Sequence, residues 1–175
     1  ANCFYRKEVL EAVGGFDERF SRPWREDSDL FFTLLEHNYN LVEVPQAVVI
    51  HPVFKAPWGI SLNLQSKSLY NALLYKKHPL LYWKYVQPSP PWNYYQILSL
   101  LVLSFVGWLG RLPGLAIIAL FLWFLLTLRF TVQRLRNTDK GISHILEMLA
   151  TSMLIPPLAI YWRLAGAIRF KVVFL

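Results

Sequence analysis

Several features that soluble proteins normally have are scarce in this sequence of 175 residues. It contains one cysteine, Cys3, which excludes an internal disulfide framework and a cysteine metal site. Charged residues make up only 17% of the chain, whereas a soluble domain usually has about 25%. The sequence does not begin with methionine and shows no signal peptide or amphipathic presequence. We therefore expect it to be the C-terminal part of a longer protein.

Apolar and aromatic residues are abundant instead, at 55% and 16% of the chain. Disordered chains are poor in aromatic residues, so this composition excludes disorder. The charges are divided unevenly along the sequence. Residues 1–56 carry six basic and nine acidic side chains, a net charge of −3, whereas residues 57–175 carry twelve basic and two acidic ones, a net charge of +10. A basic, apolar half indicates a membrane surface rather than nucleic acid as the partner.

The first 56 residues have the pattern of part of an α/β domain. Apolar residues three and four apart predict a short helix at residues 6–13, which a pair of glycines ends. A second helix is predicted at residues 26–38, with three acids in its first turn. Residues 40–50 are rich in β-branched side chains and contain one proline, which predicts one or two short strands.

Residues 57–91 connect this part to a strongly apolar region. A helix predicted at residues 61–77 combines leucines with three lysines, so it either lies in the membrane interface or packs on the soluble part. Lys76 and Lys77 at its end are expected to contact lipid phosphates. Tyrosines, tryptophans and prolines then gather ahead of residue 92, as in the aromatic belts of membrane proteins.

Residues 92–130 have the length and composition of a transmembrane hairpin. The only charge from Ile97 to Leu128 is Arg111, which lies between a glycine and a proline, and a helix needs about 20 residues to cross the hydrocarbon. The sequence therefore predicts two spans, residues 92–110 and 112–130. The loop at residues 131–141 is basic, so by the positive-inside rule this loop and the polar N-terminal part face the cytoplasm.

A third apolar stretch opens the last segment, residues 142–175, which ends in a basic tail. The stretch contains His144, Glu147 and a pair of prolines. If it spanned the membrane, the basic tail would lie outside the cell, against the positive-inside rule, whereas a re-entrant or interfacial helix would return the tail to the cytoplasm. The sequence leaves both arrangements open.

The densest group of chemically active side chains lies at residues 22–29, RPWREDSD. Three carboxylates stand at a predicted helix start beside two arginines and an indole. A carboxylate at the junction of a loop and a helix is held rigidly and can accept a proton from a hydroxyl nucleophile. Acids also occur at helix N-termini because they complement the helix dipole, so the spacing alone leaves both interpretations open.

Four short blocks of sequence resemble a known enzyme family. The blocks are Asn2, Gly14-Gly15-Phe16-Asp17-Glu18, Glu26-Asp27-Ser28-Asp29-Leu30 and Val48-Val49-Ile50-His51-Pro52. Their order and spacing resemble the C-terminal half of the inverting family-two glycosyltransferases with the GT-A fold. The resemblance covers residues 1–56, and the apolar segments after them resemble the membrane helices of membrane-attached members. It implies an α/β fold, a partial GT-A domain, followed by an α-helical membrane region.

The resemblance also implies a role for each candidate residue. Asp27 is the expected general base, and Glu26 stands beside it in the catalytic motif. The residues expected to contact donor or acceptor are Asn2, Trp24, Arg25, Asp29 and Lys67. His51 is the expected ligand of a divalent cation, Mg²⁺ or Mn²⁺, which is expected to bind mainly through an Asp-x-Asp motif upstream of Ala1. Because the nucleotide-binding half also lies upstream, the chain by itself is expected to be inactive.

The leading hypothesis is an inverting sugar transfer from a nucleotide-sugar donor to a lipid-linked or membrane-associated glycan. The enzyme would be a multi-pass protein of the plasma or inner membrane with its catalytic part in the cytoplasm and membrane lipids as further partners; no nucleic acid is expected. Two alternatives belong to other classes. One is a non-catalytic membrane anchor or assembly subunit whose acids only cap a helix, and the other is a small transporter component that uses His144 and Glu147.

Overall fold

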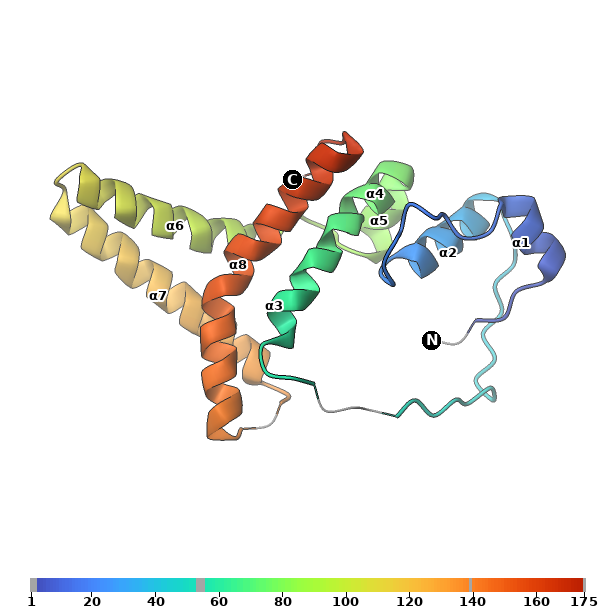
Figure 1. The fold of residues 1–175 in the computed structure, drawn as a ribbon, viewed down its shortest axis with the longest axis horizontal. Helices are drawn as coiled ribbons and strands as arrows, with labels where there is room; N and C mark the ends of the chain where they lie inside the picture. The colour runs from blue at the N-terminus through green and yellow to red at the C-terminus, as the bar shows by residue number, and fades with distance from the viewer. Residues whose placement is uncertain (1–2, 53–55, 139, 175) are drawn as a thin grey trace.

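The computed structural model describes residues 3–52, 56–138 and 140–174, which form helices joined by turns and extended segments (Figure 1). The helices in chain order are α1 (Lys7–Val13), α2 (Glu26–Glu36), α3 (Ile60–Leu64), the 3₁₀ helix η1 (Gln65–Ser68), α4 (Leu69–Lys77), α5 (Pro79–Tyr85), α6 (Trp92–Leu109), α7 (Pro113–Leu135) and α8 (Ile142–Phe170).

The described residues contain no β-strand, so the expected α/β fold with a partial GT-A domain is wrong for this structure. Residues 40–52, where strands were expected, are extended and exposed to solvent. The backbone turns beside Pro45, where the Ala47 N–H donates to the Val44 carbonyl at 3.0 Å. A strand exists only where its backbone groups pair with a neighbouring strand, and no described segment pairs with this one. The β-branched composition therefore did not suffice for a strand.

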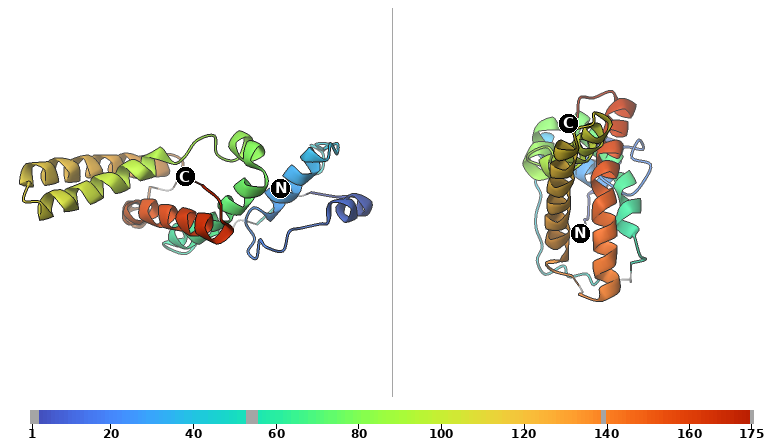
Figure 2. Two further views of the ribbon diagram at one scale, coloured as in Figure 1. Left: turned by 90° about the horizontal axis from the view of Figure 1, so that it is seen from above. Right: turned by 90° about the vertical axis from the view of Figure 1, so that its left-hand side faces the viewer.

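The molecule is elongated, with the α6–α7 hairpin at one end and α1 and α2 at the other (Figures 1 and 2). Between them, α8 runs beside the consecutive helices α3, η1 and α4, and α4 contacts α2. A buried core forms here from residues of α2, α4 and α5 and the C-terminal tail. Phe174 of the tail is 1% exposed, and its ring centroid lies 5.1 Å from that of Tyr75 and 5.3 Å from that of Tyr82.

The helix predicted at residues 61–77 is built from three consecutive pieces, α3, η1 and α4. Of the two alternatives for this segment, the structure shows packing on the rest of the protein, because five of the nine residues of α4 are buried. Gly166 of α8 allows α8 and α4 to approach each other closely. A Cβ atom at this position would lie 2.5 Å from the carbonyl oxygen of Leu69.

The bounds of α6 and α7 are similar to those of the two predicted spans, and the two helices pack tightly against each other as a hairpin (Figure 1). Gly107 faces the backbone of Ala116, and the Ser104 hydroxyl donates to the Ala116 carbonyl at 3.0 Å. Small residues and hydroxyls at such contacts are typical of membrane helices. Within the part of the chain that the structure describes, α7 and α8 are long and apolar enough to cross a membrane, and only 22% and 33% of their most apolar windows are buried. A core helix of a soluble protein would be mostly buried.

Candidate active site

The turn that leads into α2 is held in an unusual backbone conformation. Arg25, which precedes the helix, has φ 77° and ψ −6°, in the left-handed region that costs free energy for any residue except glycine. Its carbonyl still accepts the Asp29 N–H at 2.8 Å, and its Nε donates to Asn71 Oδ1 of α4 at 2.8 Å. Strained residues of this kind often occur at functional sites, where the surrounding contacts maintain them.

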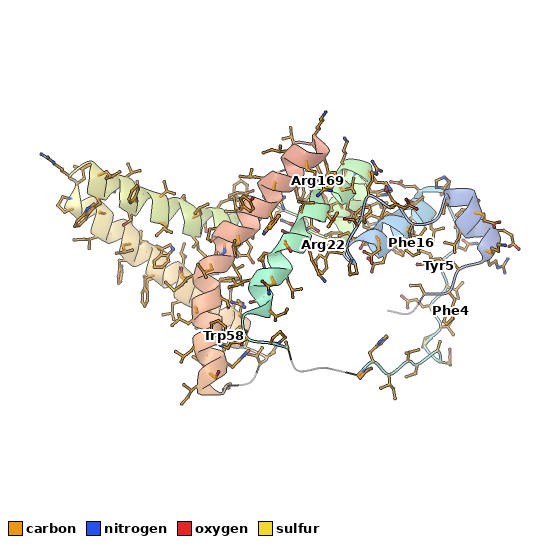
Figure 3. The ribbon with its side chains drawn as sticks, viewed as in Figure 1. Phe4, Tyr5, Phe16, Arg22, Trp58 and Arg169 are labelled. Carbon is orange, nitrogen blue, oxygen red and sulfur yellow. The ribbon has the colours of Figure 1, made fainter. Side chains whose placement is uncertain are left out.

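A basic and aromatic surface lies beside this turn. The Trp24 indole N–H donates to Asn71 Oδ1 at 3.3 Å, and the Trp24 ring has the Arg25 guanidinium 4.9 Å and Lys67 Nζ 5.8 Å from its centroid. Arg22, labelled in Figure 3, donates to the Ser66 hydroxyl at 3.0 Å. We call Arg22, Trp24, Arg25, Lys67 and Asn71 the Trp24 surface. Three of the residues that we expected to bind substrate therefore come together.

The Trp24 surface carries more positive than negative charge. Among the described residues, no carboxylate forms a salt bridge with Arg22, Arg25 or Lys67. Burial lowers the pKa of Arg25, and the charges of Tyr82 and Asp27 partly offset this effect. Guanidinium and ammonium groups without a carboxylate partner are suited to bind the phosphate oxygens of a ligand.

Asp27 is exposed at the first turn of α2. Its Oδ1 accepts the Ser28 backbone N–H at 2.7 Å and the Ser28 hydroxyl at 3.3 Å, whereas Oδ2 accepts no hydrogen bond within the described part of the chain. Tyr5, labelled in Figure 3, lies close enough for its titration to respond to Asp27. Burial, a hydrogen bond with Cys3 and the negative charges of Cys3 and Asp27 raise the pKa of Tyr5 to about 12, so its hydroxyl stays protonated.

The two other acids of the motif are turned away from solvent to different extents. Glu26 is partly buried, and its Oε2 atom is buried without a hydrogen bond within the described residues. Asp29 is 2% exposed and points into the interior, where Oδ2 lies 2.7 Å from Lys77 Nζ and Oδ1 lies 3.2 Å from His78 Nε2. Asp29 therefore contacts α4 and the start of α5 rather than the surface that Asp27 occupies.

Two further carboxylates complete this group, which we call the Asp29 cluster: Asp17, Asp29, Glu36, Lys77 and His78. Lys77 Nζ lies 2.8 Å from Asp17 Oδ2, and His78 Nδ1 lies 2.9 Å from Glu36 Oε2. Burial alone lowers the pKa of His78, but hydrogen bonds and charge from Asp29 and Glu36 outweigh it, so the pKa is raised. Hydrogen bonds from Arg19 and Lys77 hold the pKa of Asp17 well below its usual value against the opposing effect of burial.

The Asp29 cluster corrects one expectation from the sequence. Lys76 and Lys77 were expected to contact lipid phosphates, but Lys77 is paired with two carboxylates and Lys76 donates to the Phe170 carbonyl at 2.8 Å. His78, to which we assigned no role from the sequence, is 4% exposed and joins both ends of α2 to the α4–α5 junction.

One expected ligand, His51, lies apart from this site, exposed in the extended segment at residues 40–52. The expected contact Asn2 lies outside the described residues. The described part of the chain contains no group of three or more His, Cys, Asp or Glu side chains that could hold a metal ion. These residues do not by themselves fit a divalent cation site.

His144 and Glu147 have contacts that attach α8 to α3. Glu147 Oε1 accepts the Gly59 backbone N–H at the start of α3 at 2.7 Å, and Oε2 lies 3.5 Å from His144 Nδ1. A carboxylate at a helix N-terminus satisfies a backbone donor that has no partner within the helix. This contact supports a structural role for the pair that we had considered as part of a transporter.

Sequence reasoning missed Tyr5, Asn71 and His78. Asn71 accepts hydrogen bonds from residues 46 and 47 positions earlier, a separation that no periodic pattern encodes. A weak signal was present, because Asn71 is a polar residue in an otherwise mainly apolar helix and His78 belongs to a cluster of basic residues before a proline.

A comparison with protein families agrees with the resemblance. The family model for glycosyl transferase family group 2 matches residues 1–164, so the chain belongs to this family. The matched range includes α6, α7 and most of α8. No curated protein and no solved structure shows a significant match to the chain.

Proposed function

We propose that the protein transfers a sugar from a nucleotide-sugar donor to a lipid-linked or membrane-associated glycan, with inversion at the anomeric carbon. Family membership supports sugar transfer in general. The observation that carries the finer proposal is the exposed Asp27 carboxylate, whose charge acts on Arg25 of the cationic Trp24 surface. A base and a group of phosphate-binding cations are the two things that such a transfer requires.

The proposed chemistry assigns a separate task to each of these features. The acceptor hydroxyl attacks the anomeric carbon from the face opposite the diphosphate, so a new C–O bond forms as the bond to the diphosphate oxygen breaks. Asp27 Oδ2 takes the hydroxyl proton during this step. Arg22, Arg25 and Lys67 stabilise the negative charge that develops on the departing diphosphate.

We propose that a divalent cation also contributes, bound mainly by an upstream Asp-x-Asp segment. When bound, such an ion would neutralise charge on the diphosphate. The support is the resemblance of the sequence motifs, and the test is loss of activity of the full-length protein in EDTA with recovery in Mg²⁺ or Mn²⁺.

The membrane association of the acceptor rests on the apolar helices. Helices α6 and α7 expose many large apolar side chains along their length, among them Phe105, Ile117 and Phe121. Such a surface is suited to lipid rather than water. A catalytic part attached to a bilayer meets acceptors that are themselves in the bilayer, which favours a lipid-linked substrate and a cytoplasmic site supplied with nucleotide sugars.

The test is the variant Asp27→Asn in the full-length protein. The amide keeps the shape of the side chain but removes the proton acceptor, so we expect turnover to fall roughly 10²-fold or more. The measurement is transfer of radiolabelled sugar from UDP-glucose, UDP-N-acetylglucosamine or GDP-mannose to the lipid extract of membranes that contain the protein.

The matched control is Glu11→Gln. Like Asp27, Glu11 is an exposed acid, but it lies on α1 and forms a surface ion pair with Lys7. This variant should retain wild-type turnover. Near-normal turnover of Asp27→Asn at normal protein levels would contradict the assignment of Asp27 as the general base. It would favour a non-catalytic anchor whose acids only stabilise a helix start.

A further inference from the structure

The three arginines near the end of α7 have two different environments. Arg134 faces α8, where NH1 donates to Thr151 Oγ1 at 2.7 Å and to Ser152 Oγ at 2.8 Å, and NH2 donates to Ser61 Oγ of α3 at 3.2 Å. Arg129 and Arg136 are exposed instead. Arg134 therefore serves the packing of three helices, and the other two arginines are available to a ligand.

Arg129 and Arg136 belong to one stripe on the outer face of α7. Six residues spaced three and four apart line an open groove of about 550 Å³: Leu125, Leu128, Arg129, Val132, Gln133 and Arg136. This spacing places them on a single face of the helix. The apolar members lie mainly toward the middle of the hairpin and the polar ones mainly toward the end of α7. The groove is therefore mainly apolar at one end and mainly polar at the other, which matches an amphiphilic ligand.

Within the described residues, the structure pairs neither arginine of the stripe, Arg129 or Arg136, with an acid. The two residues are seven positions apart, which corresponds to about 10 Å along a helix. Two arginines at this spacing, with the Gln133 amide between them, can approach one phosphate headgroup from both sides.

We propose that this stripe is a binding site for one anionic phospholipid. Its phosphate lies against Arg129, Gln133 and Arg136, and an acyl chain follows Leu125 and Leu128 toward the middle of the bilayer. The proposal rests on insertion of the α6–α7 hairpin into the membrane, with the end of α7 at the cytoplasmic surface. Anionic lipids are concentrated in that leaflet, and basic clusters next to a membrane helix bind them.

The experiment is native mass spectrometry of the full-length protein in detergent, titrated with palmitoyl-oleoyl phosphatidylglycerol or with the corresponding phosphatidylcholine. The double variant R129Q/R136Q is compared with the wild type. Since each basic residue near an anionic lipid surface contributes about 1 kcal/mol, loss of both should weaken phosphatidylglycerol binding by about 30-fold. Phosphatidylcholine binding should change little.

Two controls make the result specific. R111Q removes an exposed arginine at the opposite end of the same hairpin and should bind phosphatidylglycerol like the wild type. R129K/R136K keeps both charges and should retain most of the binding. Circular dichroism checks that each variant is folded.

The outcomes separate this proposal from the proposed function. Equal phosphatidylglycerol binding by R129Q/R136Q and the wild type would overturn the site, and equal loss in R111Q would show only a general effect of charge. Displacement of the lipid by millimolar inorganic phosphate would point to a site for free phosphate instead. If the wild type fails to enter phosphatidylcholine nanodiscs at all, membrane insertion itself is wrong. Sugar transfer by R129Q/R136Q should remain measurable, because neither residue belongs to the candidate active site.

Discussion

Asp27 and Asp29 are two residues apart on α2 but have opposite environments. Asp27 is exposed beside the Trp24 surface, whereas Asp29 is buried between Lys77 and His78. The contacts of Asp29 fix the first turn of α2 on α4, and those of Glu36 with His78 fix its last turn. In this arrangement the buried acid holds the helix that presents the exposed acid. Removal of the positive partners should therefore affect the position of Asp27 as well as stability.

The raised pKa of His78 predicts a pH dependence of stability. Because the folded protein holds the proton more tightly than the unfolded chain, the stabilisation is complete below the ordinary histidine pKa of about 6.5. It is lost as the pH rises through the raised value. We therefore expect the unfolding temperature of the wild type to fall between pH 6 and pH 9, by about 2–4 °C for each 1 kcal/mol lost in a protein of this size.

The measurement is thermal unfolding in detergent, followed by tryptophan fluorescence. In His78→Gln this part of the pH dependence should disappear, because the amide does not titrate. The control His37→Gln changes an exposed histidine near the end of α2 and should keep the wild-type profile. A His78→Gln profile as steep as that of the wild type would show that other groups cause the effect.

At the scale of single elements, the contact of α4 with α8 depends on one glycine. A methyl group on Gly166 would lie 2.5 Å from the Leu69 carbonyl oxygen and 3.1 Å from the Ala72 side chain. The first of these is a backbone atom, so α4 or α8 must shift to admit it. We expect Gly166→Ala to destabilise the protein by about 1–3 kcal/mol, the usual cost of an overpacked contact.

Thermal unfolding of Gly166→Ala tests this contact against Gly114→Ala. Gly114 lies in the first turn of α7, and nothing lies within 4 Å of a Cβ atom there. The control should therefore be neutral or slightly stabilising, since alanine has the higher helix propensity. Equal unfolding temperatures for both variants would contradict the close contact of α4 with α8 at Gly166.

Periodicity and the length of apolar runs predicted the helices well because both signals are local. The predicted bounds for α1, α2, α6 and the start of α7 agree with the structure within two residues. The strands at residues 40–50 failed because a strand depends on a partner that composition does not reveal. The Trp24 surface was partly predictable from its motif, but Asn71 and Ser66, which hold it together, contact residues more than 40 positions earlier.

For the whole molecule, the neighbours of α8 bear on its relation to the membrane. Its first part contacts α3 through Glu147 and Gly59, and its end meets α4 where Lys76 Nζ donates to Phe170. Helix α4 in turn contacts α2 and the Asp29 cluster. If α8 crossed the bilayer, these charged neighbours would enter the hydrocarbon with it, at about 2.5–3.5 kcal/mol for each charged residue at mid-membrane. The α6–α7 hairpin also contacts α8, where Arg134 near the end of α7 donates to Thr151 and Ser152, but its turn extends away from this region in Figure 1.

We therefore predict that the hairpin spans the membrane and that α8 lies along the cytoplasmic surface. This prediction favours one of the two arrangements of α8 that the sequence leaves open.

In a Cys3→Ser background, single cysteines replace the exposed residues Leu112, Asn137 and Val173. An impermeant maleimide should label position 112 in intact cells, because we expect the Arg111 turn to face outward. Positions 137 and 173 should react only after the membrane is opened. Labelling of position 173 in intact cells would show that α8 spans, and labelling of 137 but not 112 would reverse the orientation. Both ends of α8 on the cytoplasmic side would place the basic tail where the positive-inside rule requires it.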